Sequence, residues 1–262
     1  MIALVTGASS GIGEATARRL ARDAAAYQLI LVARREDRLK ALALELGGDP
    51  MVIAADLTDP KAPERIAAAV DAWHGRLDLL VNNAGAAWRG TFAEEGWENV
   101  RRHMELNFEA QVRLTGALLP LLRRSAPSAV VNVASTAGRV SRANSGAYSA
   151  SKFALAGWTD ALHLEERAHG VHVGMVLPGF VATEGFPQRQ LVDRRLTRWI
   201  VSTPEKVAEA IIDAGPGGRA ERYVPRPYWL GAVARIVLPR ATRRAVTPAA
   251  ARGRARRPPT SP

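Results

Sequence analysis

Short apolar runs alternate with longer amphipathic segments along most of the chain, and this alternation limits the possible folds more than any other feature. The short runs are rich in valine, isoleucine and leucine, and they occupy residues 2–6, 28–33, 51–55, 77–81, 129–134, 171–177 and 222–224. Segments with apolar residues at helical spacing lie between them, at residues 12–23, 36–46, 60–73, 97–122, 147–169 and 204–214. The pattern predicts an α/β fold, namely a single Rossmann-type, doubly wound domain with a mostly parallel seven-stranded sheet flanked by helices.

Composition excludes several kinds of chemistry. The chain of 262 residues has no cysteine, which rules out disulfides, thiolate metal sites and cysteine nucleophiles. Its five histidines are scattered without metal-ligand spacing, so no metal site is predicted. Met1 leads at once into the first apolar run, and we therefore expect no secretory leader and a cytoplasmic location.

The basic charge of the protein is concentrated at its C-terminal end. The formal net charge is +11, but nine arginines and no acids follow Tyr223, which leaves 27 basic and 25 acidic residues elsewhere. The body of the chain is therefore almost neutral, and nucleic-acid binding is not indicated.

The chain divides into three predicted regions. Residues 1–224 form the main domain, with a substrate loop at about 180–203; residues 225–244 form an amphipathic basic segment; and residues 245–262 form a disordered tail rich in arginine, proline and alanine. In the middle region one face of a short helix would carry Tyr228, Trp229, Val233, Ile236 and Val237. That face could cover the substrate cleft, form a subunit interface, or lie on an anionic membrane surface as a peripheral contact.

A glycine-rich turn follows the first predicted strand and leads directly into a helix. It reads Thr6-Gly7-Ala8-Ser9-Ser10-Gly11-Ile12-Gly13. Glycines allow a tight turn and close approach of the backbone to a pyrophosphate, whose charge is stabilised by free N–H groups at the helix start. An ordinary strand-to-helix turn is the alternative. We predict cofactor contacts from Gly7, Ser9, Ser10, Gly11, Ile12 and Gly13.

Two arginines, Arg34 and Arg35, follow the second predicted strand, where an NAD-preferring site has an acid that binds the ribose hydroxyls. An arginine beside a 2′-phosphate makes charge-assisted hydrogen bonds, so the sequence favours NADP(H) over NAD(H) as the cofactor, with Arg34 the stronger candidate. The alternative is that both arginines are a solvated start to the helix at residues 36–46.

Polar and small residues follow the third and fourth predicted strands. Asp56 and Leu57 come after the third, and Asn83, Ala84 and Gly85 come after the fourth. In doubly wound sheets, ligands bind beyond the carboxyl ends of the strands, so all five are candidate cofactor contacts. Asp56 can accept a hydrogen bond from an adenine amino group. Taken alone, these residues could equally cap turns and brace loops.

Tyr148 and Lys152 stand four residues apart in a predicted helix, and therefore on the same face of it. A free phenol has a pKa of about 10, and a nearby ammonium favours the phenolate and lowers that pKa. We expect this effect to make Tyr148 a usable acid or base. Ser135 follows the fifth predicted strand, at the edge of the sheet where ligands bind.

These motifs together resemble the ordered signature of short-chain dehydrogenases/reductases of the classical type, over roughly residues 1–225. The resemblance is carried by the glycine-rich turn, Asn82-Asn83-Ala84-Gly85, Asn107, Ser135, Tyr148-Ser149-Ala150-Ser151-Lys152 and Pro178-Gly179. It implies an oxidoreductase that interconverts a carbonyl and a primary or secondary alcohol by hydride transfer. It also implies a homodimer or homotetramer, built through the helices at 97–122 and 147–169.

The resemblance further assigns roles to single residues. Tyr148 would exchange the proton with the substrate oxygen, Ser135 would hydrogen-bond that oxygen, and Lys152 would bind the nicotinamide ribose. Asn107 would hold a water that relays protons toward Lys152. The loop that receives the nicotinamide amide and the phosphates would contain Pro178, Gly179, Val181 and Thr183.

The substrate is less constrained than the reaction. Candidate pocket walls are Trp88, Val140, Phe180, Phe186 and Trp199, with Arg139, Arg142 and Arg189 nearby in sequence. These residues suggest an apolar carbonyl substrate with an acidic group. Two alternatives remain, a 3-oxoacyl thioester reductase-like enzyme and a non-catalytic binding protein of the same fold. The second would usually have lost one of the four active-site residues, and none is lost here.

Overall fold

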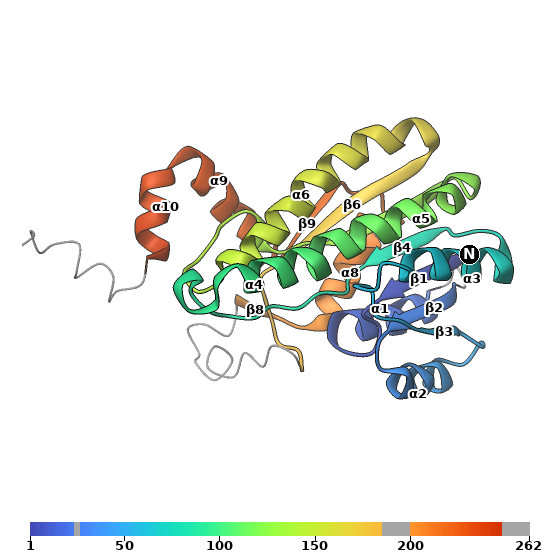
Figure 1. Ribbon diagram of the computed structural model, residues 1–262. Helices are drawn as coiled ribbons and strands as arrows, with labels where there is room; N and C mark the ends of the chain where they lie inside the picture. Colours follow the sequence, from blue (N-terminus) through green and yellow to red (C-terminus); the bar gives the residue numbers. More distant parts are fainter. Residues whose placement is uncertain (24–26, 185–199, 248–262) are drawn as a thin grey trace, which may run out of the picture.

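A parallel sheet of seven strands forms the centre of the protein, whose computed structural model describes residues 1–23, 27–184 and 200–247 (Figure 1). Along the sheet the strands are β3 (Met51–Ala54), β2 (Gln28–Ala33), β1 (Ile2–Thr6), β4 (Leu79–Asn82), β5 (Ser128–Val133), β6 (Val171–Pro178) and β9 (Glu221–Val224). Every neighbouring pair is parallel. The order reverses between β1 and β4, as in a doubly wound fold, and the predicted fold class is confirmed.

Helices cover both faces of the sheet. The helices α1 (Gly11–Ala21), α2 (Glu36–Leu46) and α8 (Pro204–Ala214) pack on one face, and α3 (Ala62–His74), α5 (Ala110–Arg124) and α6 (Gly146–Glu166) pack on the other. Successive residues of β1 alternate between the two cores, with Ala3 and Val5 on one side and Ile2 and Leu4 on the other. Both faces are buried, which explains why the strands are continuously apolar.

The helix predicted over residues 97–122 is present, but it contains a π-helical turn that the sequence did not predict. The structure has α4 (Phe92–Met104), a π-helical turn (Glu105–Glu109) and then α5. A first turn capped by Thr91 and Glu94, in which each side chain bonds the other residue's backbone N–H, precedes a kink at Gly96, whose φ of 60° is not helical. The continuous helix therefore starts after Gly96, where the sequence predicted it. The π-turn contains Asn107, and such turns commonly occur at functional sites.

The C-terminal region leaves the sheet after β9. A turn (Arg226–Tyr228) leads into α9 (Trp229–Val237) and α10 (Pro239–Val246), which lie at one end of the molecule (Figure 1). Helix α10 includes Ala245 and Val246, which the sequence assigned to the disordered tail. Residues 248–262 lie outside the described residues. Among the helices of the described ranges, none is long and apolar enough to span a membrane.

The predicted substrate loop is described only at its two ends. There a small parallel sheet pairs β7 (Phe180–Val181) with β8 (Val201–Ser202). The remaining part, residues 185–199, lies outside the described residues. Three predicted pocket residues, Phe186, Arg189 and Trp199, fall in that part.

Candidate active site

A cleft of about 760 Å³ opens beyond the carboxyl ends of the central strands. The predicted site residues that line it are Gly7, Ser9, Ser10, Gly11, Ile12, Arg34, Arg35, Asp56, Leu57, Asn83, Ala84, Gly85, Ser135, Tyr148, Lys152, Pro178, Gly179, Val181 and Thr183. The other two predicted site residues, Gly13 and Asn107, lie behind the residues that line the cleft. The topology therefore brings together residues that are far apart in the sequence, at the edge where ligands bind in such sheets.

The glycine-rich turn has the backbone that its sequence predicts. Gly7 and Gly11 have φ values of 66° and 60°, in the left-handed region that favours glycine. Gly13 has a different role, because a Cβ at this position would collide with the carbonyl oxygen of Gly7. Gly13 therefore allows α1 to pack closely against the turn, while Gly7 and Gly11 shape the surface that faces the cleft.

Asn83 joins the ends of two strands. Its side-chain Nδ2 donates to the Thr6 carbonyl at 2.9 Å, and its backbone N–H donates to the Thr6 hydroxyl at 2.9 Å. The N–H of Ala84 donates to the same hydroxyl at 3.0 Å. The side chain of Asn83 thus braces a loop, as one of the two interpretations of the sequence expected, and the loop it braces lines the cleft.

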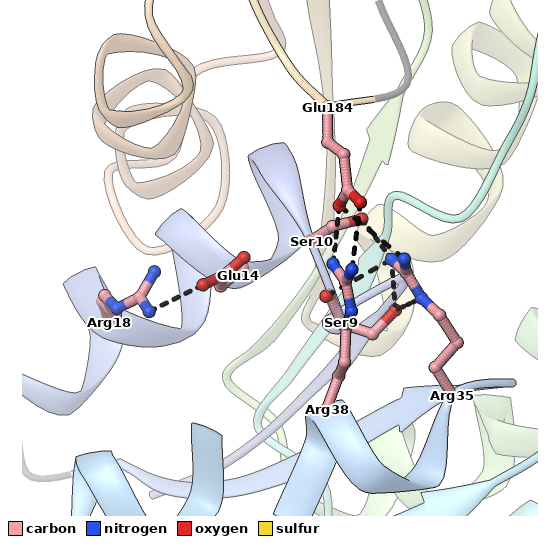
Figure 2. Close-up of polar contacts among 7 residues, drawn as sticks. All are labelled: Ser9, Ser10, Glu14, Arg18, Arg35, Arg38 and Glu184. Carbon is pink, nitrogen blue, oxygen red and sulfur yellow. Dashed lines mark hydrogen bonds and ion pairs between the residues drawn. The ribbon is translucent and has the colours of Figure 1, made fainter. Parts of the chain in front are cut away.

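The two arginines after β2 point in different directions. The Arg35 Nη2 donates to the Ser10 hydroxyl at 2.7 Å and to the Ser9 hydroxyl at 3.1 Å, so Arg35 lies over the glycine-rich turn (Figure 2). The side chain of Arg34 is 74% exposed, and its nearest acid is Asp56 at 3.9 Å. Arg34 was the stronger candidate from the sequence, but it is Arg35 that contacts the turn.

Sequence reasoning missed two charged residues beside Arg35. The Glu184 carboxylate accepts hydrogen bonds from Arg38 at 2.6 and 3.0 Å and lies 3.6 Å from Arg35 (Figure 2). Arg38 lies in the first turn of α2, shortly after Arg34 and Arg35, and this third nearby arginine is a signal that the sequence offered. Glu184 offered none, because it follows Thr183 in a loop far along the chain. Two guanidinium groups thus converge on one anionic group at the mouth of the cleft.

Asp56 is held in its ionised form. Burial raises the pKa of its carboxyl group, but hydrogen bonds from the backbone N–H and hydroxyl of Thr58, at 3.0 and 2.8 Å, outweigh burial and leave the pKa below its ordinary value. The carboxylate caps the turn that follows β3, and it also lines the cleft. An ionised carboxylate at this position can accept a hydrogen bond from an amino group.

Ser135 and Tyr148 meet at the opposite end of the cleft. Ser135 is buried at the end of β5, where its hydroxyl accepts a hydrogen bond from the Ala137 N–H at 3.1 Å. The same hydroxyl donates to the Pro178 carbonyl at 3.3 Å, and it interacts with the Tyr148 phenol, which projects from the first turn of α6. Both hydroxyl groups face the cleft, and they can bind one oxygen atom of a ligand between them.

The expected effect of Lys152 on Tyr148 is absent. Burial raises the pKa of the Tyr148 phenol above its usual value, while the neighbouring Ser135 hydroxyl and the charge of Arg142 only reduce this rise. Lys152 is not among the groups that shift this pKa: its side-chain nitrogen donates to the Val133 carbonyl at 2.8 Å, and burial lowers its own pKa to about 7. The prediction that a neighbouring ammonium lowers the Tyr148 pKa is therefore wrong for this state of the protein.

Asn107 is fully buried behind the cleft. Its Nδ2 donates to the Ala86 carbonyl at 2.9 Å and to the Ser151 hydroxyl at 3.1 Å, and its Oδ1 accepts from the Ala86 N–H at 2.9 Å. These bonds tie the π-turn to the loop after β4 and to α6. The side chain therefore has a bracing role, and the predicted part of Asn107 in holding a water stays a prediction.

His103, which sequence reasoning also missed, connects the loop after β4 to Tyr148. Its buried ring hydrogen-bonds the Asn99 carbonyl at 2.7 Å through Nδ1 and accepts from the Trp88 N–H at 3.0 Å through Nε2. Burial lowers the pKa of His103, which favours the neutral ring that this pattern requires. Its ring also lies edge-on to those of Trp88 and Tyr148. The only sequence feature that could have pointed to His103 was its position four residues before Asn107.

The cleft fits a nicotinamide dinucleotide. Its volume lies in the range of cofactor sites, and the glycine turn leaves the N-terminal end of α1 open to phosphate groups. Within the described ranges no cluster of acidic and histidine side chains is placed to hold a metal ion. The arrangement therefore separates the guanidinium groups of Arg35 and Arg38, beside the glycine-rich turn, from the hydroxyl groups of Ser135 and Tyr148.

The comparisons with known proteins agree with this arrangement. Residues 1–191 match the short chain dehydrogenase family. The chain is 32% identical to dehydrogenase/reductase SDR family member 7B of Xenopus laevis, over 85% of this chain and 73% of that protein. It is 33% identical to the ketoacyl reductase HetN of Nostoc, over 80% of this chain and 74% of that protein. The fold and the site are those of an oxidoreductase built on a nucleotide-binding sheet.

Solved structures are similar in the same way. A short-chain dehydrogenase from Streptomyces avermitilis superposes with a TM-score of 0.77 at 33% identity, covering 90% of this chain and 92% of that one. RhlG of Pseudomonas aeruginosa, solved as an NADP active-site complex, superposes with a TM-score of 0.76 at 30% identity, covering 85% and 94%. The chain belongs to the short-chain dehydrogenase/reductase family.

Proposed function

We propose that this protein is an NADP(H)-dependent reductase that converts a carbonyl group to an alcohol and catalyses the reverse reaction. The observation that carries the proposal is the pairing of Ser135 and Tyr148 at one end of a cleft whose other end has two converging arginines. A non-catalytic protein of this fold would not need both the pair of hydroxyl groups and the converging arginines. When bound, the cofactor supplies or accepts a hydride at the nicotinamide ring.

The side chains at the cleft floor perform the proton chemistry. The Ser135 hydroxyl donates a hydrogen bond to the substrate carbonyl oxygen, which polarises the carbonyl and positions its oxygen against the Tyr148 phenol. The raised pKa of Tyr148 keeps the phenol protonated, so it enters carbonyl reduction as a ready proton donor. In the oxidative direction, the phenolate takes the proton from the alcohol.

Lys152 lines the cleft together with Tyr148, and it would hold the nicotinamide ribose by hydrogen bonds when the cofactor is bound. Its pKa of about 7 means that a modest gain in polar contacts is enough to favour the ammonium over the neutral amine. We infer that ligand binding restores the charge of Lys152 by adding hydrogen-bond acceptors. A charged Lys152 would then lower the pKa of Tyr148 and help the oxidative direction.

The preference for NADP(H) over NAD(H) rests on the arginines. Arg35 lies over Ser9 and Ser10, and Arg38 converges with it on the Glu184 carboxylate, so the site already accommodates one anionic group. A 2′-phosphate presents more acceptor oxygens and more charge than a carboxylate, and guanidinium groups bind it bidentately. The related RhlG was solved with NADP, which supports the same choice.

The substrate proposed is an apolar carbonyl compound with an anionic group. Trp88 and Phe180 line the cleft together with Arg89 and Arg142, and the Arg142 guanidinium stacks 4.4 Å from the centre of the Phe180 ring. Apolar walls favour an aliphatic or aromatic chain, and the arginines favour a carboxylate or phosphate on it. A 3-oxoacyl thioester is the second candidate, since the relative HetN is a ketoacyl reductase.

We also propose that two copies associate through α4 and α6. Large apolar side chains are exposed on both helices, with Phe92 and Trp97 on α4 and Phe153 and Leu164 on α6. The two helices lie against each other, so these side chains can contribute to a common interface. Sedimentation of wild type and Phe153→Asp would test the association, and a monomeric wild type would refute it.

The proposed reaction is tested by following NADPH absorbance with a panel of ketones, aldehydes and 3-oxoacyl thioesters. Tyr148→Phe removes only the hydroxyl group, and we expect it to lower kcat by a factor of about 100 or more, in line with the usual size of acid–base catalysis. Tyr223→Phe, in β9 outside the cleft, is the matched control. Reduction that continues unchanged in Tyr148→Phe would remove the proposed mechanism.

A further inference from the structure

Helix α9 presents a row of exposed apolar side chains. Trp229, Leu230, Val233, Ile236 and Val237 follow helical spacing along one side, and Leu238 extends the row at the helix end. Ile236, the most exposed of them, is 80% accessible. Only Ala232 of this helix is buried, so the packed side of α9 is small and the solvent-facing side is the apolar one. This is the reverse of an ordinary surface helix.

Helix α10 adds a row of positive charge beside the apolar row. Arg240, Arg243 and Arg244 have i, i+3, i+4 spacing, share one face and are all exposed. The two helices contact each other, and the Thr242 hydroxyl donates to the Ala234 carbonyl at 2.9 Å. No acidic residue occurs from Tyr223 to the end of the chain, so no carboxylate of this segment neutralises the arginines.

We propose that the α9–α10 hairpin is a docking surface for an anionic lipid bilayer. Burial at the acyl boundary lowers the free energy of apolar side chains, and nearby anionic headgroups lower that of arginines. A bilayer would therefore stabilise both rows at once. A second copy of this chain would cover the apolar row but would place like-charged arginines together. Charge complementarity therefore favours a lipid surface over self-association.

The docking surface is joined directly to the cleft. Tyr228, the residue before α9, packs its ring against Gly179, where a Cβ would collide with that ring. Its hydroxyl donates to the Ile200 carbonyl at 3.0 Å. Gly179 lines the cleft, so the hairpin is anchored at the wall of the site rather than at a remote part of the domain. Docking would hold this side of the cleft against the bilayer.

Co-sedimentation of the full chain with vesicles tests the proposal. We expect binding to vesicles of phosphatidylglycerol and phosphatidylcholine, weak binding to phosphatidylcholine alone, and loss of binding as salt screens the charge. The triple variant Arg240→Gln, Arg243→Gln, Arg244→Gln should lower the partition coefficient roughly 100-fold, at about 1 kcal/mol for each arginine. Its control is Lys40→Gln, Lys61→Gln, Lys206→Gln, which removes the same charge from exposed positions of the main domain.

A second pair of variants tests the apolar row. Ile236→Glu should reduce binding at least tenfold, whereas Leu44→Glu, at a residue that is 86% exposed on α2, should leave it unchanged. Equal binding by both triple variants, or equal binding to neutral and anionic vesicles, would overturn the proposal. A change of oligomer size in Ile236→Glu without change in vesicle binding would show that a second copy covers the row, and would also overturn it. None of these measurements depends on catalytic activity.

Discussion

The ring of His103 meets the ring of Tyr148 edge-on, with their centroids 6.1 Å apart. The same histidine accepts a hydrogen bond from the Trp88 N–H and donates one to the Asn99 carbonyl. One buried, neutral side chain therefore positions the proposed proton donor and a wall of the cleft together. His103 acts through its neighbours, and we treat it as a positioning residue.

Replacing His103 tests this positioning role. His103→Leu leaves the Trp88 N–H without its acceptor, at a cost of about 1–3 kcal/mol, and we expect kcat/KM to fall about tenfold or more. His103→Gln offers both an acceptor and a donor, and it should recover part of the loss. Steady-state kinetics measure the effect, with circular dichroism as the check on folding. Equal loss in both variants would mean that the ring contributes by volume alone.

Arg35 should contribute more to the binding of NADP(H) than Arg34 does. Arg35 lies over the glycine-rich turn, while Arg34 is mostly exposed. We expect Arg35→Ala to raise the Kd for NADPH about tenfold and Arg34→Ala to raise it less, since a hydrogen bond to a charged group contributes about 1.5–3 kcal/mol. Fluorescence titration measures both, and NADH, which lacks the 2′-phosphate, is the control ligand. A larger effect of Arg34→Ala would contradict the assignment.

Glu184 should oppose the binding of a 2′-phosphate. Its carboxylate occupies the point where Arg35 and Arg38 converge, and the two arginines in turn hold the pKa of Glu184 below its ordinary value. Glu184→Gln removes the competing charge, so we expect affinity for 2′,5′-ADP to rise several-fold and affinity for 5′-ADP to stay constant. Isothermal titration calorimetry provides the comparison. A weaker affinity in Glu184→Gln would show that the acid organises the site.

The buried Lys152 should make stability depend on pH. The folded chain releases the Lys152 proton near pH 7, whereas the unfolded chain keeps it to about pH 10.4. Between these values the unfolded state binds more protons, so stability rises with pH; below pH 7 the full cost of the buried charge is present. Lys152→Met should be more stable than wild type at pH 6 and should show a smaller rise from pH 7 to 9. Urea unfolding of the cofactor-free protein measures both, and parallel pH curves would refute the prediction.

Much of the fold follows from local patterns. The strand runs are short, apolar on both faces and separated by helical spacing, so the seven strands and their flanking helices could be predicted to within one or two residues at most ends. The π-turn at Glu105–Glu109 could not, because one extra residue in a helical turn hardly changes the apolar spacing. The extra turn before Gly96 depended on the Thr91 capping box, which acts through two hydrogen bonds rather than through hydropathy.

In the candidate site, too, some residues follow from local patterns and others are brought in only by tertiary packing. Gly7, Ser135, Tyr148 and Lys152 were identified from residue type and spacing, because their chemistry and their place after a strand or along a helix are local properties. Which arginine faces the turn was decided by side-chain direction at the end of β2. Glu184 and His103 came into the site only because distant segments pack together.

The sequence by itself determined the order of strands and helices, the phosphate-binding turn and the pair of residues placed for proton exchange, since each depends on neighbours within a few residues. Tertiary structure alone decided the electrostatics. Burial lowers the pKa of Lys152 to about 7, burial keeps Tyr148 protonated, and the Glu184 carboxylate lies beside two arginines. Ionisation depends on the surrounding solvent and charge, and these are properties of the packed molecule rather than of its sequence.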